Sequence, residues 1–323
     1  MKIFGIAPTP SPLSKRLRGI LLVVAASLFW GTAGIFIFKI VELGGLSAAG
    51  LAFWRNLLSS LILLIGILII DPKLLVVKKE DWPWLIGMGV ISIGFFHIFW
   101  NIAVLRLGAS LATVIQSNAT VIVSLLAWIL FKEELSLRKI LAIIAAGAGT
   151  ILAAGMVGQL DIQVDSVGIW VGLGSAITYG SLSLFGKKLS GVYNSLTITF
   201  YIFSIGTLTT FLYQGGQPDP WPIGSGILPW MLGHVLMSTM LGFWVYTKAL
   251  SILPASVATI ISTSEILFAA ILAAIFLGER LGIWQILGAA LIIIGVVLVS
   301  LHKKNTKRLC SPSSPGDESS GYS

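Results

Sequence analysis

Charged residues are scarce in this chain: only 11% of its 323 residues are Asp, Glu, Lys or Arg, whereas 56% are hydrophobic. Ordinary soluble proteins carry about 25% charged residues. This shortage of charge and the mean hydropathy of +0.96 exclude a soluble globular protein and indicate a membrane protein.

Cysteine is almost absent as well. The single cysteine, Cys310, lies in a polar tail beyond the last apolar segment, so neither a disulfide framework nor a thiolate metal site can be built. No histidine cluster supports metal ligation, and the sequence lacks a Gly-rich loop ending in Lys-Ser or Lys-Thr, which would bind phosphates. We therefore expect no metal, no cofactor and no ATP-driven reaction.

Two more function classes lack support. The net charge of +8 comes from short basic clusters between apolar runs, a pattern typical of cytoplasmic loops and not of a nucleic-acid-binding face. An intramembrane enzyme would need a nucleophile with its base, or paired carboxylates, but Glu265 is the only acid in the apolar core. We expect neither a nucleic-acid partner nor an enzyme.

Long apolar runs dominate the chain. Each is close to the roughly 20 residues that a helix needs to cross the hydrocarbon layer, and the strands of a membrane barrel would be much shorter. The first run is also too long for a cleavable signal peptide. We predict an all-α polytopic membrane protein with ten transmembrane helices, at residues 18–39, 46–70, 83–105, 109–131, 136–156, 167–187, 195–213, 227–250, 254–277 and 281–301.

Two of these runs are copies of one another. Residues 253–281, moved back by 146 positions, align with residues 107–135, and both segments share a G/P-A-S-x-A-T opening and a closing Glu-x-Leu. A second alignment, offset by 149, places Trp30-Gly31 on Tyr179-Gly180. These internal repeats indicate that the chain contains a duplicated structural unit. They also predict helix breaks at the equivalent positions Gly108 and Pro254.

The basic residues predict the orientation. Most lysines and arginines fall in loops that are cytoplasmic if both termini are inside, and only Lys39, Arg106 and Arg280 fall outside. Five helices per repeat is an odd number, so the second copy enters the membrane inverted. The predicted units are a disordered cytoplasmic N-terminus (1–17), a first repeat (18–156), an extracytoplasmic linker (157–166), a second repeat (167–301) and a disordered cytoplasmic tail (302–323).

These features resemble the drug/metabolite transporter superfamily, in particular its EamA-type ten-helix members. The residues that carry the resemblance are Trp30-Gly31, Arg55, Tyr246 with Ala249 and Leu250, Pro254 with Ala255 and Ala258, and the Leu-Gly-Glu-Arg-Leu of residues 277–281. The resemblance implies a secondary transporter that moves small solutes by alternating access. One departure is that Ile266 follows Glu265 where relatives often carry proline, so the resemblance implies no kink here.

Glu265 is the sharpest candidate for a functional residue. It lies about 11 residues into its predicted span, roughly 16 Å along a helix and hence near the membrane midplane. An ionisable group there is costly unless it is paired or protonated. We interpret it as a proton-carrying or cation-binding group; the alternative is a neutral acid bonded to a neighbouring helix.

Other intramembrane polar and aromatic residues are weaker candidates. Arg55 could bind a substrate carboxylate, pair with Glu265 or bond to helix-end carbonyls. The repeats match Trp30 with Tyr179 and Trp100 with Tyr246, which predicts an aromatic cavity; interfacial anchoring is the alternative, above all for Tyr246. The predicted substrate-binding residues are Trp30, His97, Trp100, Asn101, Gln116, Asn118, Tyr179, Ser262 and Glu265, with Glu265 as the coupling candidate.

The sequence thus predicts a transporter of the cytoplasmic membrane that exports small organic metabolites, in the first place amino acids or related compounds. Proton coupling is a hypothesis. An exporter of lipophilic or quaternary cations is the alternative, and a membrane scaffold or intramembrane enzyme is a remote one. The expected partners are a small-molecule substrate and the lipid bilayer, and both a monomer and a homodimer remain open.

Overall fold

The computed structural model describes residues 12–153, 165–224, 226–277 and 282–301, and the regular structure in these ranges is helical. Six of the described helical segments are long and apolar enough to cross a membrane. The prediction of an all-α polytopic membrane protein is confirmed. The predictions for residues 1–11, for most of the linker, for the tail and for residues 278–281 lie outside the described residues.

The first half of the chain begins with a helix ahead of the expected residue 18. A π-helical segment, η3 (Val90–Phe95), joins two of its helices, and η1 (Pro72–Leu75) and η2 (Lys79–Asp81) are short 3₁₀ turns. The Ser47 hydroxyl accepts the Gly50 N–H and so fixes the start of α3. The helices are α1 (Pro12–Gly31), α2 (Ala33–Gly44), α3 (Ala48–Ile70), α4 (Trp82–Gly89), α5 (Phe96–Gln116), α6 (Ala119–Phe131) and α7 (Leu137–Ala153).

The second half contains a π-helical segment at the corresponding place, η4 (His234–Leu241), between α10 and α11. Asp165 and Asn194 cap their helices by accepting the N–H groups of Val167 and Leu196. The helices are α8 (Ser166–Leu189), α9 (Ser195–Tyr213), α10 (Leu228–Gly233), α11 (Gly242–Leu250), α12 (Ala255–Ser262), α13 (Ser264–Leu277) and α14 (Ile283–Ser300).

The two predicted helix breaks have different outcomes. The break at Pro254 is present, since α11 ends at Leu250 and α12 begins at Ala255. At Gly108 no helix boundary is assigned, because α5 runs from Phe96 to Gln116. The chain nevertheless reverses inside α5: Phe99 lies beside Gly174 and Ile115 beside Gly172, although a straight helix would separate the two side chains by about 24 Å.

Three further breaks were not predicted, at Thr32, at residues 117–118 and at Thr263. At each one a side chain donates to the carbonyl three residues earlier and competes with the regular helical bond. The donors are Thr32 Oγ1 to Phe29 at 2.6 Å, Asn118 Nδ2 to Ile115 at 2.8 Å and Thr263 Oγ1 to Ile260 at 2.7 Å. Helix interruption therefore needs no proline in this chain.

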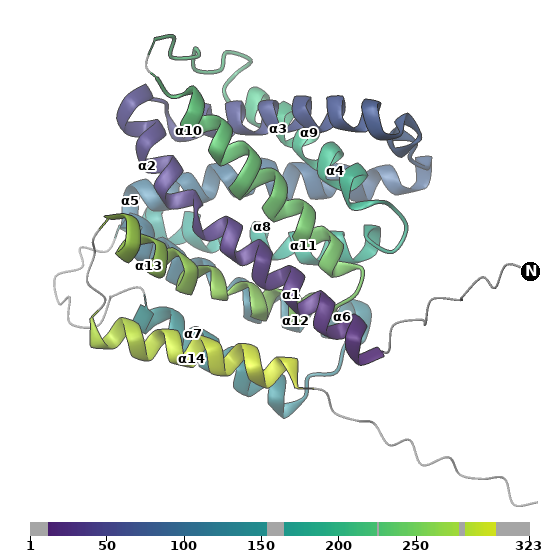
Figure 1. Ribbon diagram of the computed structural model, residues 1–323, viewed down its shortest axis with the longest axis vertical. Coiled ribbons are helices and arrows are strands. Elements are labelled where there is room, and N and C mark those ends of the chain that lie inside the picture. The colour runs from purple at the N-terminus through teal and green to yellow at the C-terminus, as the bar shows by residue number, and fades with distance from the viewer. Residues whose placement is uncertain (1–11, 154–164, 225, 278–281, 302–323) are drawn as a thin grey trace, which may run out of the picture.

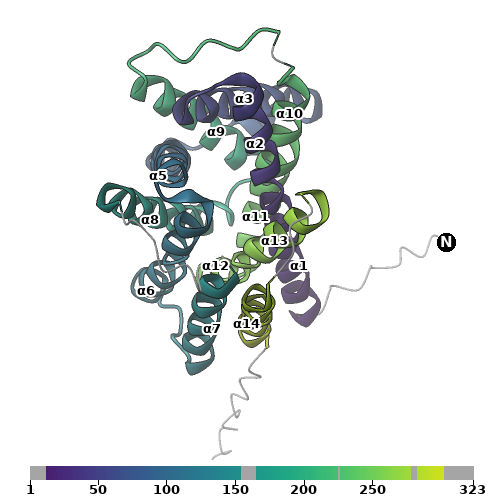
Figure 2. The ribbon, with the colours of Figure 1, turned by 90° about the vertical axis from the view of Figure 1, so that its left-hand side faces the viewer.

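The helices form a bundle with two distinct edges (Figure 1). Helices α7 and α14 lie side by side at one edge, and α3 and α9 lie together at the other (Figures 1 and 2). Gly149 brings α7 so close to α14 that a Cβ atom built on it would lie 2.7 Å from the Gly288 carbonyl oxygen. Small residues allow such close helix packing in membranes.

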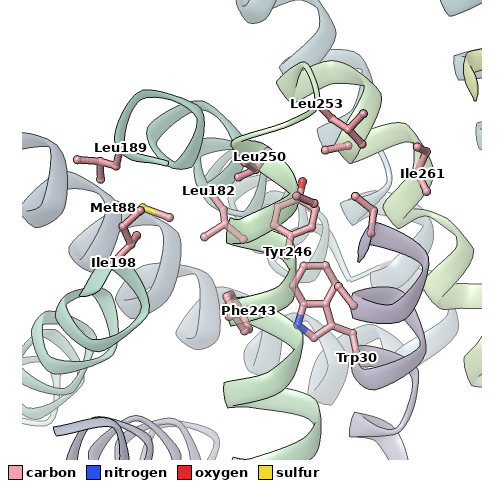
Figure 3. Close-up of a cluster of buried hydrophobic side chains, with 14 of the residues drawn as sticks. Trp30, Met88, Leu182, Leu189, Ile198, Phe243, Tyr246, Leu250, Leu253 and Ile261 are labelled. Atoms are coloured by element: carbon pink, nitrogen blue, oxygen red, sulfur yellow. The ribbon is translucent and has the colours of Figure 1, made fainter. Parts of the chain in front are cut away.

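The core lies where α1, α8, α11 and α12 meet. Trp30, Phe243, Tyr246 and Leu250 are buried there (Figure 3). Helix α1 runs alongside α12 and α13, since Ser27 Oγ lies 3.4 Å from the Ser262 carbonyl oxygen. The first helix of the chain is thus central and packs against the penultimate span.

Contacts between segments that are far apart in the sequence define two ends of the bundle. At one end Arg16 donates to Val299 at 2.8 Å, and Tyr193 donates to Asp81 at 2.5 Å. At the other end Arg106 forms an ion pair with Asp165 at 2.7 Å, and the Ser47 N–H donates to Asp219 at 2.8 Å. The start of α1 and the end of α14 therefore lie at the same end.

Candidate functional site

A cluster of aromatic rings is centred on Trp30, near the end of α1. The ring centroids of Tyr179, Phe243 and Tyr246 lie 6.2, 5.2 and 5.0 Å from that of Trp30. Trp30 and Tyr179, which the repeat predicted as equivalent, are therefore in contact. Their edge and tilted contacts are the favourable arrangements for aromatic pairs, so the cluster is a preformed apolar wall.

Phe96 and His97, at the start of α5, extend this cluster. Phe96 lies 5.2 Å from Tyr179 and stacks on Trp100 at 6.5 Å, while the His97 ring meets Phe243 edge-on at 6.2 Å. The sequence interpretation missed Phe96 and Phe243. The offset of 146 could have found Phe243, because it is the repeat equivalent of His97.

Tyr246 is not an interfacial anchor, so that alternative is wrong. Its side chain is 1% exposed, and its hydroxyl lies 2.7 Å from Ser183 Oγ and 3.4 Å from Thr259 Oγ1. A tyrosine at the membrane interface would keep one end in water. Tyr246 instead fixes α11 against α8 and α12 in the core.

Two interrupted helices converge on the middle of α8. The last residues before two of the breaks, Gln116 and Ser262, are equivalent in the 146-residue repeat. Tyr179 of α8 donates to Ser262 Oγ at 3.4 Å, and the neighbouring Gly180 faces Ala119, the first residue of α6. A break in each repeat thus reaches the same part of α8.

Glu265 follows the second of these breaks, in the first turn of α13. Its side chain is half-buried and makes no hydrogen bond or ion pair with any residue that the structure describes. The N-terminus of a helix favours negative charge because its N–H groups lack partners. The position can therefore hold a carboxylate and leave it available to a ligand.

Three more predicted site residues lie in α5 or directly after it. Gln116 ends α5, and its Oε1 is buried without a partner among the described residues. Asn118 is exposed and donates to Ile115 at the break. Asn101 donates to the Ala48 carbonyl at 2.7 Å, so it fastens α5 to the start of α3.

A basic cluster, defined as Arg55, His97 and His234, adjoins the aromatic cluster through the contact of the His97 ring with Phe243. Arg55 Nη1 is 3.2 Å from His234 Nε2, and Ser238 Oγ is 2.6 Å from His234 Nδ1. None of the three ion pairs in the described ranges involves Arg55 or Glu265. The suggested pairing of these two residues is therefore wrong.

The site is thus a row of aromatic rings between a half-buried carboxylate and a buried guanidinium. Within the ranges that the structure describes, no three His, Cys, Asp or Glu side chains form a group that could hold a metal ion. The arrangement is suited to binding a small organic solute between helices, the usual place for such sites in helical bundles.

A multi-pass membrane architecture that is helical in the described residues and contains interrupted helices is typical of membrane transporters. The EamA-like transporter family, part of the drug/metabolite transporter superfamily, matches residues 17–155 and again residues 166–301. The chain therefore belongs to the EamA-like transporter family.

Several relatives agree with this assignment. The uncharacterized transporter YwfM of Bacillus subtilis is 27% identical and aligns over 89% of this chain and 95% of its own length. The uncharacterized inner membrane transporter YicL of Salmonella typhimurium is 23% identical over 90% and 98% of the two chains. A solved crystal structure shares the fold with a TM-score of 0.73 at 15% identity, covering 87% of this chain and 95% of the other.

Proposed function

We propose that this transporter exports small organic metabolites, in the first place amino acids or related compounds, across the cytoplasmic membrane by alternating access. The observation that carries the proposal is the pair of interrupted helices, ending at Gln116 and Ser262, that meet Tyr179 and Gly180 of α8. In secondary transporters, discontinuous helices at a repeat interface hold the substrate near the midplane.

We also propose ten transmembrane helices in two inverted repeats, with repeats at 18–156 and 167–301. The two separate matches of the family model support this division. The equivalent positions of η3 and η4 support it too. The contact of Arg16 with Val299 favours an even number of membrane crossings, because it places the start of α1 and the end of α14 at the same end of the bundle.

The proposed orientation has both termini in the cytoplasm. The end of the bundle that holds Arg16 and Val299 is also where Lys187 donates to Leu253 and Lys139 pairs with Glu133. Cytoplasmic loops are enriched in lysine and arginine. The termini therefore belong on the cytoplasmic side of the membrane.

Glu265 is the proposed proton-coupling residue. Its half-buried carboxylate forms no hydrogen bond or ion pair with the described residues, and a charge inside the membrane is less costly when it is neutralised by a proton or a bound cation. Loading and releasing a proton here would link the pH gradient to the movement of the helices around the break at Thr263.

Flux measurements in liposomes test this proposal. A metabolite comparison of cells with and without the gene identifies the substrates, and purified protein is then reconstituted with an imposed pH gradient. We expect Glu265→Gln to lose gradient-driven flux and to retain exchange down a substrate gradient. Glu42→Gln, in an exposed ion pair with Lys39, is the matched control. Full gradient-driven flux by Glu265→Gln would rule out coupling through this residue.

A second candidate function is export of lipophilic or quaternary cations, which the aromatic rings beside the Glu265 carboxylate favour. Binding of a quaternary ammonium compound and of a neutral amino acid to the purified protein separates the two functions. Tighter binding of the ammonium compound would favour the multidrug function.

A further inference from the structure

We propose that the basic cluster binds the carboxylate of a small organic acid, and that the Nε–Nη2 edge of Arg55 is the principal donor. The proposal rests on the transport function proposed above and specifies its substrate class. It places the substrate carboxylate at the guanidinium end of the aromatic row, away from Glu265.

The hydrogen bonds around His234 fix how Arg55 is held. Ser238 Oγ donates to the His234 carbonyl oxygen at 2.9 Å, so at the 2.6 Å contact with His234 Nδ1 it accepts. Nδ1 therefore carries the hydrogen, and Nε2 is free to accept from Arg55 Nη1 at 3.2 Å. A neutral His234 thus orients the guanidinium without adding charge.

The other edge of the guanidinium is unpaired. Arg55 is 7% exposed, and its Nε and Nη2 have no hydrogen-bond partner among the described residues. These two nitrogens point in parallel along one edge of the planar group, and a carboxylate binds such an edge through two parallel hydrogen bonds. A buried charge without a partner is costly, so a ligand that completes this edge gains binding energy.

The neighbouring residues suit the rest of such a ligand. His97 is 1% exposed, lies within electrostatic range of Arg55 and His234, and has an unpartnered Nδ1. Its ring touches Phe243, which in turn contacts Trp30. A carboxylate on Arg55 would therefore place an attached apolar group against aromatic rings.

The single positive charge of Arg55 favours a ligand that carries one negative charge. Arg55 is the strongest base of the cluster, and no acidic residue pairs with it in the described ranges. A carboxylate neutralises this single charge. A phosphate dianion would leave a buried negative charge uncompensated, which is costly.

Both histidines of the cluster adjoin π-helical segments. His234 is the first residue of η4, and His97 follows η3 by two residues. Such segments are rare, and they are frequent at functional sites because they re-aim side chains. Their presence at equivalent places in the two repeats is an independent indication that this region binds a ligand.

Calorimetric titration of the purified full-length protein tests the proposal with 3-phenylpropionate and its neutral amide, 3-phenylpropionamide. We expect the carboxylate to bind at least about tenfold more tightly, since a charge-assisted bidentate contact is lost in the amide. Arg55→Gln should bring this ratio close to one, and Arg106→Gln, at an exposed arginine, should leave it unchanged. The proposal fails if the wild type shows no preference for the carboxylate, or if the preference survives in Arg55→Gln.

A second measurement uses only the wild type and does not depend on the folding of a variant. Phenylglyoxal modifies arginines, and peptide mass spectrometry reports the modification of Arg55 and Arg106 separately. We expect 3-phenylpropionate to slow the modification of Arg55 several-fold and to leave Arg106 unaffected. An Arg55 that is never modified, or that is modified equally fast with the probe, would contradict a ligand site reached from water.

The two proposals fail in different ways. Preferential carboxylate binding at Arg55 without flux in liposomes would reject the transport function and retain the site. Flux of metabolites with no carboxylate preference and no dependence on Arg55 would retain the transport function and reject the site.

Discussion

The Glu133 carboxylate accepts the backbone N–H of Ala255 at 2.9 Å, so the loop after α6 caps the first residue of α12. Pro254 precedes this helix and has no side-chain oxygen to serve as a cap. Glu133 also accepts from the Ser256 hydroxyl and pairs with Lys139 at 3.1 Å. One carboxylate therefore fastens α12 to the loop between α6 and α7.

Replacing Glu133 by alanine should lower the stability of the folded protein by about 1–2 kcal/mol, the usual cost of losing a helix cap. Thermal unfolding of the purified protein in detergent measures this loss. Glu134→Ala is the matched control, because it removes the same charge from an adjacent, exposed position. Equal melting temperatures for the two variants would contradict the capping role.

Tyr246 and Tyr179 should respond differently to removal of the hydroxyl group. Tyr246→Phe breaks a buried hydrogen bond of 2.7 Å to Ser183 and should cost about 1 kcal/mol of stability with little change in flux. Tyr179→Phe removes only a 3.4 Å contact to Ser262, so it should alter flux more than stability. Melting temperatures and initial flux rates of both variants test this contrast, which the opposite pattern would refute.

The contact between α7 and α14 depends on Gly149. A leucine there would collide with the backbone of α14, where a Cβ atom would already lie 2.8 Å from Ile292 N. Gly149→Leu should therefore destabilise the protein by about 1–3 kcal/mol. Gly147→Leu on the same helix, with open space around the site, should be tolerated. The fraction of protein that remains monodisperse after heating compares the two.

The ion pair at the opposite end should depend on pH. Arg106 donates to Asp165 at 2.7 Å, and this hydrogen bond holds the pKa of the Asp165 carboxyl below its ordinary value of 3.8. Because the pKa is lower in the folded state, the stabilisation is present above the ordinary pKa and is lost as the pH falls through the folded value.

Arg106→Gln should consequently be slightly less stable than the wild type at pH 7, since exposed pairs contribute little, and the difference should vanish in strong acid. Melting temperatures measured in a series of buffers from pH 7 down into strong acid follow this difference. Lys39→Gln, which breaks a different exposed pair, is the control. A difference that grows in acid would contradict this account.

The sequence predicts an all-α membrane protein because hydrophobic length is a local property. The span predicted at residues 195–213 coincides with α9, and Pro254 separates two helices as expected. The interruption at Thr263 could not be predicted in this way. A threonine hydroxyl can donate either to a carbonyl of its own helix or to another side chain. Which of these bonds forms depends on how the helices pack, and the sequence does not show this.

The candidate site was predictable where the repeat paired residues, as with Trp30 and Tyr179. It was not predictable where one residue of a pair is aromatic and the other polar, as with Phe243 and His97. Arg55 was visible as an intramembrane charge, but its partner depended on which helix faces it. The bond to His234 arises from the packing of α3 against η4, which no spacing in the sequence encodes.

The bonds that Arg16 makes to Val299 and Ser300 and the bond of Ser27 to Ser262 join parts of the chain that are synthesised far apart in time. Helix α1 enters the membrane first, yet most of its buried face has no neighbours until α8, α11, α12 and α13 have been made. A nascent chain that stopped after α7 would leave Trp30 without its ring partners Tyr179, Phe243 and Tyr246. The first helix of the chain is therefore not fully packed until helices near the C-terminal end of the chain have been made.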